Sequence, residues 1–435
     1  MSTVAAVKLW GSTIGAVALE EGADTAVFEY SRDFLQSGIE VAPLTMPLSD
    51  RIYRFPSLPA GTFHGLPGLL ADSLPDRFGN ALINAWLATQ GRTPESFNAV
   101  ERLCYTGVRG MGALGYEPAT GPRPRRTTQI QVDMLVDLAS EILTRRGDIK
   151  LSLEGSIRKK ALRDILRVGT SAGGARAKAV IAWNPGTNEV RSGQVAAGDG
   201  FEYWILKFDG VRGNKDKELE DPQGYGAIEY AYSNMARDAG IDIGACRLLE
   251  ENGRRHFMTR RFDRLANGDK LHMQSLGAMA HFDYNMAGAY GYEQALAVIR
   301  QLGLSMDTIE DMFRRMVFNI IGRNQDDHVK NIAFLMDRKG RWALAPAYDI
   351  TFSFNPTGEW TASHQMTLNG KRGNFTLDDF KASAVSAGMK KGRAESILEE
   401  VRQVVAGWKD YAEAAGVSTE QMEHIQSTLL LDPFQ

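Results

Sequence analysis

The chain has 435 residues, of which 43% are hydrophobic and 24% charged, and its formal net charge is −3. This composition predicts a soluble globular protein of two or three subdomains, and the near-neutral charge argues against nucleic acid as the default partner. Cys104 and Cys246 are the only cysteines, which excludes a disulfide framework and a cysteine-based zinc site and fits a cytoplasmic location. No apolar run approaches the ~18 residues of a membrane span, and residues 4–14 predict a strand, a tight turn and a second strand.

The first 128 residues predict an N-terminal α+β subdomain that ends in a linker. Residues 72–76, Asp-Ser-Leu-Pro-Asp, carry helix-start chemistry: Ser73 is suited to cap, Pro75 to the first turn and Asp76 to the N-terminal dipole. Residues 118–126 then combine three prolines and one glycine with three arginines. That composition is typical of a solvated connector, and a nucleic-acid patch is the weaker alternative.

Residues 129–435 predict helices that alternate with strand pairs, and three segments have the residue types of a nucleotide site. Residues 169–178 are a glycine-rich loop that could bring backbone N–H groups close to phosphates, although an ordinary turn has the same composition. Lys207 lies inside an apolar strand, where a charge needs a partner, and Glu229 on the next helix could pair with it. Solvent-exposed side chains are the alternative for both. Phe262 lies in a connector where it could stack on adenine.

The most informative stretch is residues 322–331, Gly-Arg-Asn-Gln-Asp-Asp-His-Val-Lys-Asn, which places Asp326 five positions before Asn331. The catalytic loop of protein kinases uses the same spacing: its Asp accepts the proton of the substrate hydroxyl, and its Asn binds a magnesium ion. Apolar residues from 309 to 321 recur at helical spacing. We therefore expect a buried helix that ends at Gly322 and holds the start of the loop.

Two short strands, at residues 332–335 and 342–345, are expected after this loop. They lead to Asp349, which follows Asp326 by 23 positions. In a kinase, the strand pair after the catalytic loop ends in a second magnesium-binding Asp. Asp349 is therefore where such a residue is needed.

Seven segments together resemble the HipA family, the serine/threonine kinase toxins of bacterial type II toxin–antitoxin modules. The segments are Leu66-Pro-Gly68, Asp72-Ser-Leu-Pro-Asp76, Ser171-Ala-Gly-Gly174, Trp204-Ile-Leu-Lys207, Arg261-Phe-Asp-Arg264, Asp326-Asp-His-Val-Lys-Asn331 and Pro346-Ala-Tyr-Asp349. The resemblance covers nearly the whole chain and implies an α+β fold. The implied fold has a two-lobed protein-kinase-like catalytic domain over residues 129–435 and an added N-terminal subdomain over residues 1–128. The two lobes divide near residue 260, and the C-terminal lobe is mostly helical.

The resemblance also implies roles for individual residues. Asp326 would be the catalytic base, Asn331 and Asp349 the magnesium ligands, and Lys207 the anchor of the ATP phosphates. Ser171 falls on the serine that the family toxins phosphorylate on themselves to switch off, and a phosphoserine there would repel ATP phosphates. The other candidates are His328 and Lys330 in the catalytic loop, and Gly173, Gly174, Lys178, Glu229 and Phe262 at the ATP site.

The implied cofactors are ATP and Mg²⁺. The implied partners are a HipB-like helix-turn-helix antitoxin, operator DNA mainly through that antitoxin, and a translation protein such as glutamyl-tRNA synthetase as substrate, with no membrane partner. His328 stands where ordinary protein kinases have Lys, and no DFG glycine follows Asp349, so the loop is of the HipA type. Two other functions stay open: a metal-dependent phosphohydrolase using Asp326, Asp327, His328 and Asp349, and a catalytically weak corepressor acting with a DNA-binding antitoxin.

Overall fold

The structure is a computed structural model that describes residues 2–121, 130–144, 164–166, 168–169, 176–194, 197–211, 223–265 and 268–431. The chain divides into two compact units that are not consecutive stretches. Unit 1 is Met1–Gln223, Leu249–Gln274 and Leu335–Arg341, and unit 2 is Gly224–Leu248, Ser275–Phe334 and Trp342–Gln435. No helix among the described residues is long and apolar enough to cross a membrane.

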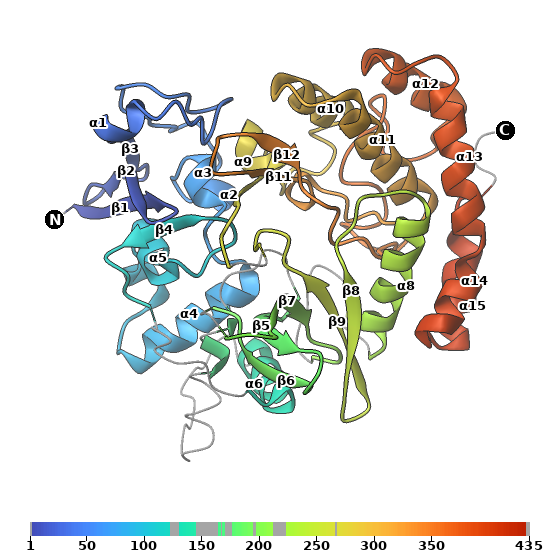
Figure 1. Cartoon of the computed structure of the whole chain (residues 1–435), viewed down its shortest axis with the longest axis horizontal. Coiled ribbons are helices and arrows are strands. Elements are labelled where there is room, and N and C mark those ends of the chain that lie inside the picture. The colour runs from blue at the N-terminus through green and yellow to red at the C-terminus, as the bar shows by residue number, and fades with distance from the viewer. Residues whose placement is uncertain are drawn as a thin grey trace. The chain divides into compact units, whose positions relative to one another are not determined.

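Unit 1 begins with an antiparallel four-stranded sheet in the order β3-β2-β1-β4 (Figure 1). Its strands are β1 (Thr3–Leu9), β2 (Ser12–Leu19), β3 (Val27–Tyr30) and β4 (Leu114–Glu117). Val7 pairs with Gly15 of β2 on one side and with Tyr116 of β4 on the other. The strand, turn and strand predicted near the N-terminus are confirmed, because β1 and β2 are joined at Trp10 and Gly11, which both have positive φ.

Five α-helices of unit 1 lie between or beside these strands in the sequence. They are α1 (Arg32–Leu35), α2 (Ala60–Phe63), α3 (Gly68–Ala71), α4 (Arg77–Thr89) and α5 (Ala99–Thr106), with a 3₁₀ helix at Pro94–Ser96. A helix does start directly after residues 72–76, but the prediction that Ser73 caps it was wrong. Asp76 itself is the N-cap of α4, with Oδ1 accepting the Gly79 N–H at 2.6 Å. Ser73 instead accepts a hydrogen bond from the Tyr116 hydroxyl.

A second sheet in unit 1 has the strand order β6-β5-β7-β9-β8. Its strands are β5 (Lys178–Asn184), β6 (Glu189–Ser192), β7 (Glu202–Lys207), β8 (Cys246–Glu251) and β9 (Arg254–Arg260). The sheet shares one hydrophobic core with α4 and with α6 (Val132–Thr144), built around Leu82, Val136, Ile181 and Leu206. In this sheet Lys178 lies opposite Lys207 in the antiparallel register.

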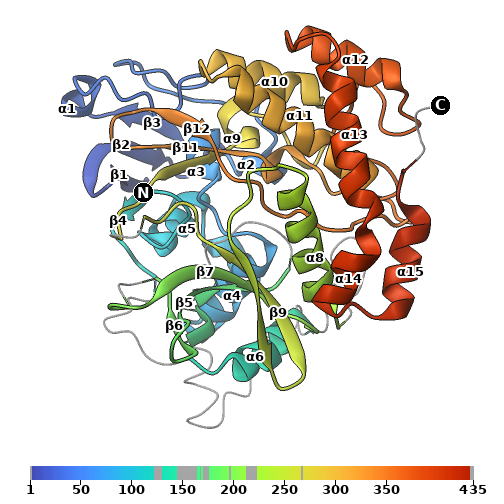
Figure 2. The same ribbon diagram turned by 45° about the vertical axis from the view of Figure 1, so that its right-hand side comes forward.

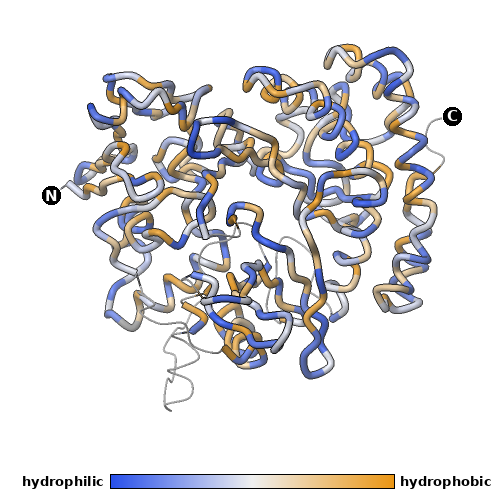
Figure 3. The backbone as a smooth tube through the Cα atoms, in the orientation of Figure 1, coloured by the Kyte–Doolittle hydropathy of each residue, from blue (hydrophilic) through white to orange (hydrophobic). Residues whose placement is uncertain are grey.

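Unit 2 is mostly helical. Its helices are α8 (Tyr225–Asp238), α9 (Leu276–Ala280), α10 (Tyr292–Gln301), α11 (Met306–Ile321), α12 (Leu377–Ser386), α13 (Arg393–Ala406), α14 (Trp408–Ala415) and α15 (Thr419–Thr428). Figure 2 shows α14 beside α8, where the Trp408 and Tyr232 rings pack 5.1 Å apart. Hydrophobic and hydrophilic residues alternate along α13 to α15 in Figure 3, as in amphipathic helices.

Helix α11 confirms the predicted buried helix, because Ile309, Phe313 and Ile320 are all nearly inaccessible and Gly322 is the C-cap. The remaining strands are β10 (His272–Ser275), β11 (Ala333–Met336) and β12 (Trp342–Leu344), of which β11 and β12 follow the loop in the sequence. The two strands predicted after the loop therefore exist. The loop therefore starts at the end of a buried helix, which places its first residue.

Candidate active site

The loop after α11 is closed by hydrogen bonds between its own residues. The Asn331 side-chain amide donates from Nδ2 to the Asp326 carbonyl oxygen at 2.9 Å, and the Asn331 N–H donates to the His328 carbonyl at 2.9 Å. Residues Val329–Asn331 form one turn of 3₁₀ helix. The Asp326 N–H donates to Ser353 Oγ at 3.2 Å. Both ends of the Asp-x-x-x-x-Asn motif are therefore fixed to each other and to the following chain.

The Asp326 carboxylate is held by an indole. Trp360 Nε1–H donates to Asp326 Oδ1 at 2.6 Å, and His328 Nε2 lies 3.9 Å from the same oxygen. The Asp326 side chain is 44% exposed, so this carboxylate stays accessible to a substrate. A positioned, accessible carboxylate can act as a general base.

Asp349 lies next to this loop in unit 2. The Tyr348 hydroxyl donates to the Lys330 carbonyl at 2.7 Å, which ties the residue before Asp349 to the residue before Asn331. Asp349 has a φ of 54°, a left-handed conformation that Asp tolerates better than most residues. The predicted magnesium ligands thus belong to two segments that are bonded to each other.

The donor set of these residues fits a magnesium ion. Asn331 uses Nδ2 as a hydrogen-bond donor, which assigns Oδ1 as its ligand atom, and Asp349 supplies a carboxylate. Mg²⁺ prefers such oxygen ligands, with substrate phosphates completing its coordination. When bound, the ion would neutralise phosphate charge.

A network of buried polar side chains connects α11 to the chain segment around Asp349. Asn324 is 2% exposed, and its Nδ2 donates to Asn319 Oδ1 at 2.9 Å and to the Asp349 carbonyl at 3.3 Å. Its Oδ1 accepts the Ser353 hydroxyl at 2.8 Å. Asn319 in turn donates to the Tyr292 hydroxyl at 3.1 Å. One buried amide therefore links α11 to the backbone of Asp349.

Asp327 has a structural role in this network. The carboxylate is buried and accepts the Tyr292 hydroxyl at 2.6 Å and the Gln365 N–H at 2.7 Å, with His364 Nδ1 at 2.8 Å. Burial raises the pKa of Asp327, but the His364 charge and these hydrogen bonds together outweigh it and lower the pKa below its usual value. Because its oxygens are used internally, Asp327 is a poor metal ligand. Among the described residues, no three His, Cys, Asp or Glu side chains gather as a metal site.

His328 and Lys330 both lie near the Tyr284 ring. The His328 ring centroid is 5.9 Å from that of Tyr284, and Lys330 Nζ is 4.8 Å from it. Within the described part of the chain, His328 Nδ1 has no hydrogen-bond partner. Tyr284 thus orients the two basic side chains that the sequence assigned to catalysis.

The predicted nucleotide residues belong mainly to unit 1. Lys207 ends β7, with Nζ 5.6 Å from the Phe257 ring, and Lys178 starts β5, with Nζ 4.0 Å from Asp76 Oδ2. Phe262 follows β9 between the buried residues Arg261 and Asp263. Ser171, Gly173 and Gly174 lie outside the described residues.

Glu229 is buried on α8 of unit 2. Its predicted pairing with Lys207 stays a prediction, because the two residues belong to different units.

Sequence reasoning missed Trp360, Asn324 and Gln365 as parts of this site. Trp360 follows Asp326 by 34 residues, and no periodicity or motif announces its contact. Asn324 could have been suspected, since it is a polar residue just after a buried helix. Gln365 acts mainly through its backbone N–H, which sequence does not reveal.

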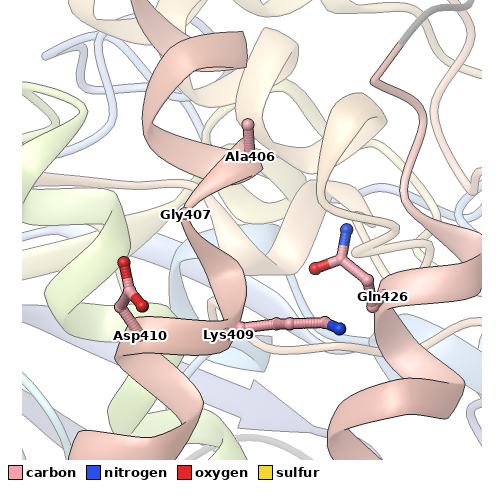
Figure 4. A pocket seen from close by; sticks show the side chains of 5 residues that line it. All are labelled: Ala406, Gly407, Lys409, Asp410 and Gln426. Atoms are coloured by element: carbon pink, nitrogen blue, oxygen red, sulfur yellow. The ribbon is translucent and has the colours of Figure 1, made fainter.

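Figure 4 shows an open pocket of about 310 Å³ elsewhere in unit 2. It is lined by Ala406, Gly407, Lys409, Asp410 and Gln426. None of the predicted site residues lines it. Its two charges have opposite sign, so no ligand class is favoured there.

The kinase-type Asp–Asn loop on a mixed α/β fold defines the class of the protein as kinase-like. The chain belongs to the HipA family: residues 5–117 match the HipA N-terminal domain, and residues 170–408 match the HipA-like C-terminal domain. The resemblance inferred from the seven segments is thereby confirmed.

Curated relatives and a solved structure agree with this assignment. A protein of Haemophilus influenzae named "Putative kinase" is 26% identical over 38% of this chain and 56% of its own length. A Sinorhizobium fredii protein named "Putative kinase Y4dM" is 25% identical over 43% of this chain and 48% of its own length. The chain thus spans about half the length of these relatives.

The fold itself matches that of HipA from Shewanella oneidensis MR-1, solved with HipB and its operator DNA. The match covers 99% of this chain and 96% of that chain, with a TM-score of 0.68 and 16% identity. At this identity the match shows the fold. The expected α+β, HipA-type fold is therefore confirmed.

Proposed function

We propose that this protein is an ATP- and Mg²⁺-dependent serine/threonine protein kinase that acts as the toxin of a toxin–antitoxin module. The observation that carries the proposal is the hydrogen bond from Asn331 Nδ2 to the Asp326 carbonyl, beside an accessible Asp326 carboxylate. Asp349 joins this loop through Tyr348. The three residue types and their order are those of a phosphoryl-transfer centre.

In the proposed reaction, Asp326 accepts the proton of a serine or threonine hydroxyl as that oxygen bonds to the γ-phosphorus of ATP. The bond from the γ-phosphorus to its bridging oxygen breaks, and ADP leaves. Asn331 and Asp349 would hold the magnesium ion. Lys207 and Lys178, which lie opposite each other on neighbouring strands, would bind phosphate oxygens.

The wider biological role rests on the family. A HipB-like antitoxin and operator DNA are proposed as partners, in keeping with the complex in which the Shewanella protein was solved. A translation protein such as glutamyl-tRNA synthetase is the proposed substrate class, and phosphorylation of Ser171 is the proposed off-switch. The complex of the Shewanella protein with HipB and operator DNA also motivates the second candidate function, a corepressor with little or no catalysis.

One experiment tests the proposal: incubate the full chain with γ-labelled ATP and Mg²⁺ and compare it with Asp326→Ala. The kinase predicts label on the protein that maps to Ser171, with at least a hundredfold lower rate in the variant. Label released to water without protein labelling would indicate a hydrolase. No turnover, together with binding to antitoxin and promoter, would leave the corepressor.

A further inference from the structure

Trp360 is joined to the catalytic loop at more than one point. Its indole N–H donates to Asp326 Oδ1 at 2.6 Å. Its backbone carbonyl accepts the side-chain amide of Gln365, whose own N–H donates to Asp327 Oδ1 at 2.7 Å. Trp360 therefore contacts Asp326 directly and is also connected, through Gln365, to Asp327.

A further contact fixes the next residue of the same segment. With its amide in the orientation that satisfies both of its atoms, Gln325 donates to the Thr361 carbonyl at 2.7 Å and accepts from Arg323 Nη1 at 3.1 Å. Residues 325, 326 and 327 therefore contact residues 361, 360 and 365. The segment that carries the indole is therefore anchored to the loop at residue 360 and at residues 361 and 365, which follow it.

We propose that Trp360 is a positioning residue for Asp326, an inference that rests on the proposed kinase function. A carboxylate on a half-exposed aspartate rotates readily, and each rotamer presents a different oxygen to the substrate. The indole N–H holds Oδ1 in one place and so keeps the carboxylate in one orientation. Preorganisation of a general base raises the rate of the chemical step more than the affinity for ATP.

The test removes only the N–H. Trp360 is replaced by 3-benzothienyl-alanine, which keeps the two-ring shape with sulfur in place of the indole nitrogen. Initial rates of label transfer from γ-labelled ATP are measured with the full chain. We expect the maximal initial rate of label transfer at saturating ATP, taken as kcat, to fall about tenfold or more, because a hydrogen bond to a charged group is lost. The ATP concentration for half of that rate, taken as KM, should stay within about twofold.

A matched control is the same replacement at Trp204, a buried residue whose indole N–H has no hydrogen-bond partner among the described residues. We expect this control to change kcat less than about twofold. In ¹⁵N-tryptophan spectra, Asp326→Ala should shift the Trp360 indole signal and leave that of Trp204 in place. A merely structural role of Trp360 would not produce the split between kcat and KM.

Three results would overturn the proposal. They are an unchanged kcat in the Trp360 analogue, a kcat that rises because the indole blocks the base, and an unshifted Trp360 signal in Asp326→Ala. A wild-type chain that transfers no label would instead contradict the proposed kinase function, which keeps the two failures distinguishable.

Discussion

Asp76 uses its two carboxylate oxygens for different tasks in unit 1: Oδ1 caps α4, and Oδ2 lies 4.0 Å from Nζ of Lys178. Both side chains are almost fully buried. Removing one partner of a buried ion pair weakens the compensation of the other charge and can cost more stability than removing both partners together. The family segment around residues 72–76 is thus bonded to the strand that follows the proposed phosphate loop.

Asp76→Ala should destabilise unit 1 by more than the loss of a helix cap alone. The expected loss is about 1 kcal/mol from the helix cap, with a further loss from the weakened ion pair with Lys178. Urea unfolding followed by circular dichroism measures it. The double variant Asp76→Ala with Lys178→Met should recover stability relative to Asp76→Ala alone, and a double variant as unstable as the sum of the singles would contradict this account.

Gly112→Ala should destabilise unit 1 more than the same substitution at Gly253, another left-handed glycine of this unit. Gly112 has a φ of 73°, and an added Cβ would lie 2.7 Å from the Met273 nitrogen. Its N–H also donates to Asp263 Oδ2 at 2.7 Å. Gly253 is the matched control, because its φ is 76° and no atom lies within 4 Å of an added Cβ.

We expect about 1 kcal/mol of conformational strain in both variants and about 1–3 kcal/mol more for Gly112→Ala from the clash. Unfolding midpoints in urea compare the two. Equal losses would show that the backbone near Met273 relaxes freely.

Stability should fall as the pH drops from about 7.5 to 5, partly through His256. Burial lowers the pKa of His256 from 6.5 to about 4. The nearby Asp209 carboxylate acts in the opposite direction, but its effect is smaller. His256 Nδ1 accepts the Asp209 N–H at 2.9 Å, so the ring is neutral in this geometry. As the pH falls, this histidine is protonated in the unfolded chain before it is protonated in the folded chain, which favours unfolding. The loss of stability from this group amounts to roughly 1–2 kcal/mol at pH 5.

His256→Asn keeps an acceptor that does not titrate. Its unfolding free energy should depend less steeply on pH than that of the wild type between pH 7.5 and 5. Parallel pH profiles of the two proteins would exclude His256 as a source of the dependence.

Asn324→Asp should weaken the catalytic loop. The new carboxylate would face Asn319 Oδ1 and the Asp349 carbonyl, two acceptors that Asn324 Nδ2 now satisfies. We expect about 1–3 kcal/mol lower stability. If Asp349 holds magnesium, the Mg²⁺ concentration for half-maximal label transfer should also rise. Ser353→Ala removes a donor to Asn324 Oδ1 and the acceptor of the Asp326 N–H but adds no charge beside Asp349, so its effect on this Mg²⁺ dependence should be smaller.

Sequence reasoning located the helix and strands around the loop, because Ile309 to Ile321 repeat at helical spacing and local patterns determine such elements. It misplaced the start of α4, because Ser73 and Asp76 are both good caps and only tertiary packing decides between them. It offered Asp327 as a metal ligand in one alternative. The carboxylate is instead buried against Tyr292 and His364, partners 35 and 37 residues away that no local pattern predicts.

The hydrogen bond between Asn331 and Asp326 gives the five-residue spacing a geometric meaning. A side chain that bonds back to the backbone of an earlier residue closes a ring, and the size of that ring is set by the number of residues between them. A single inserted or deleted residue would therefore open the ring, even if every functional side chain were kept. The loop is a ring closed by one side-chain hydrogen bond, so its function depends on its length as well as on the identity of its residues.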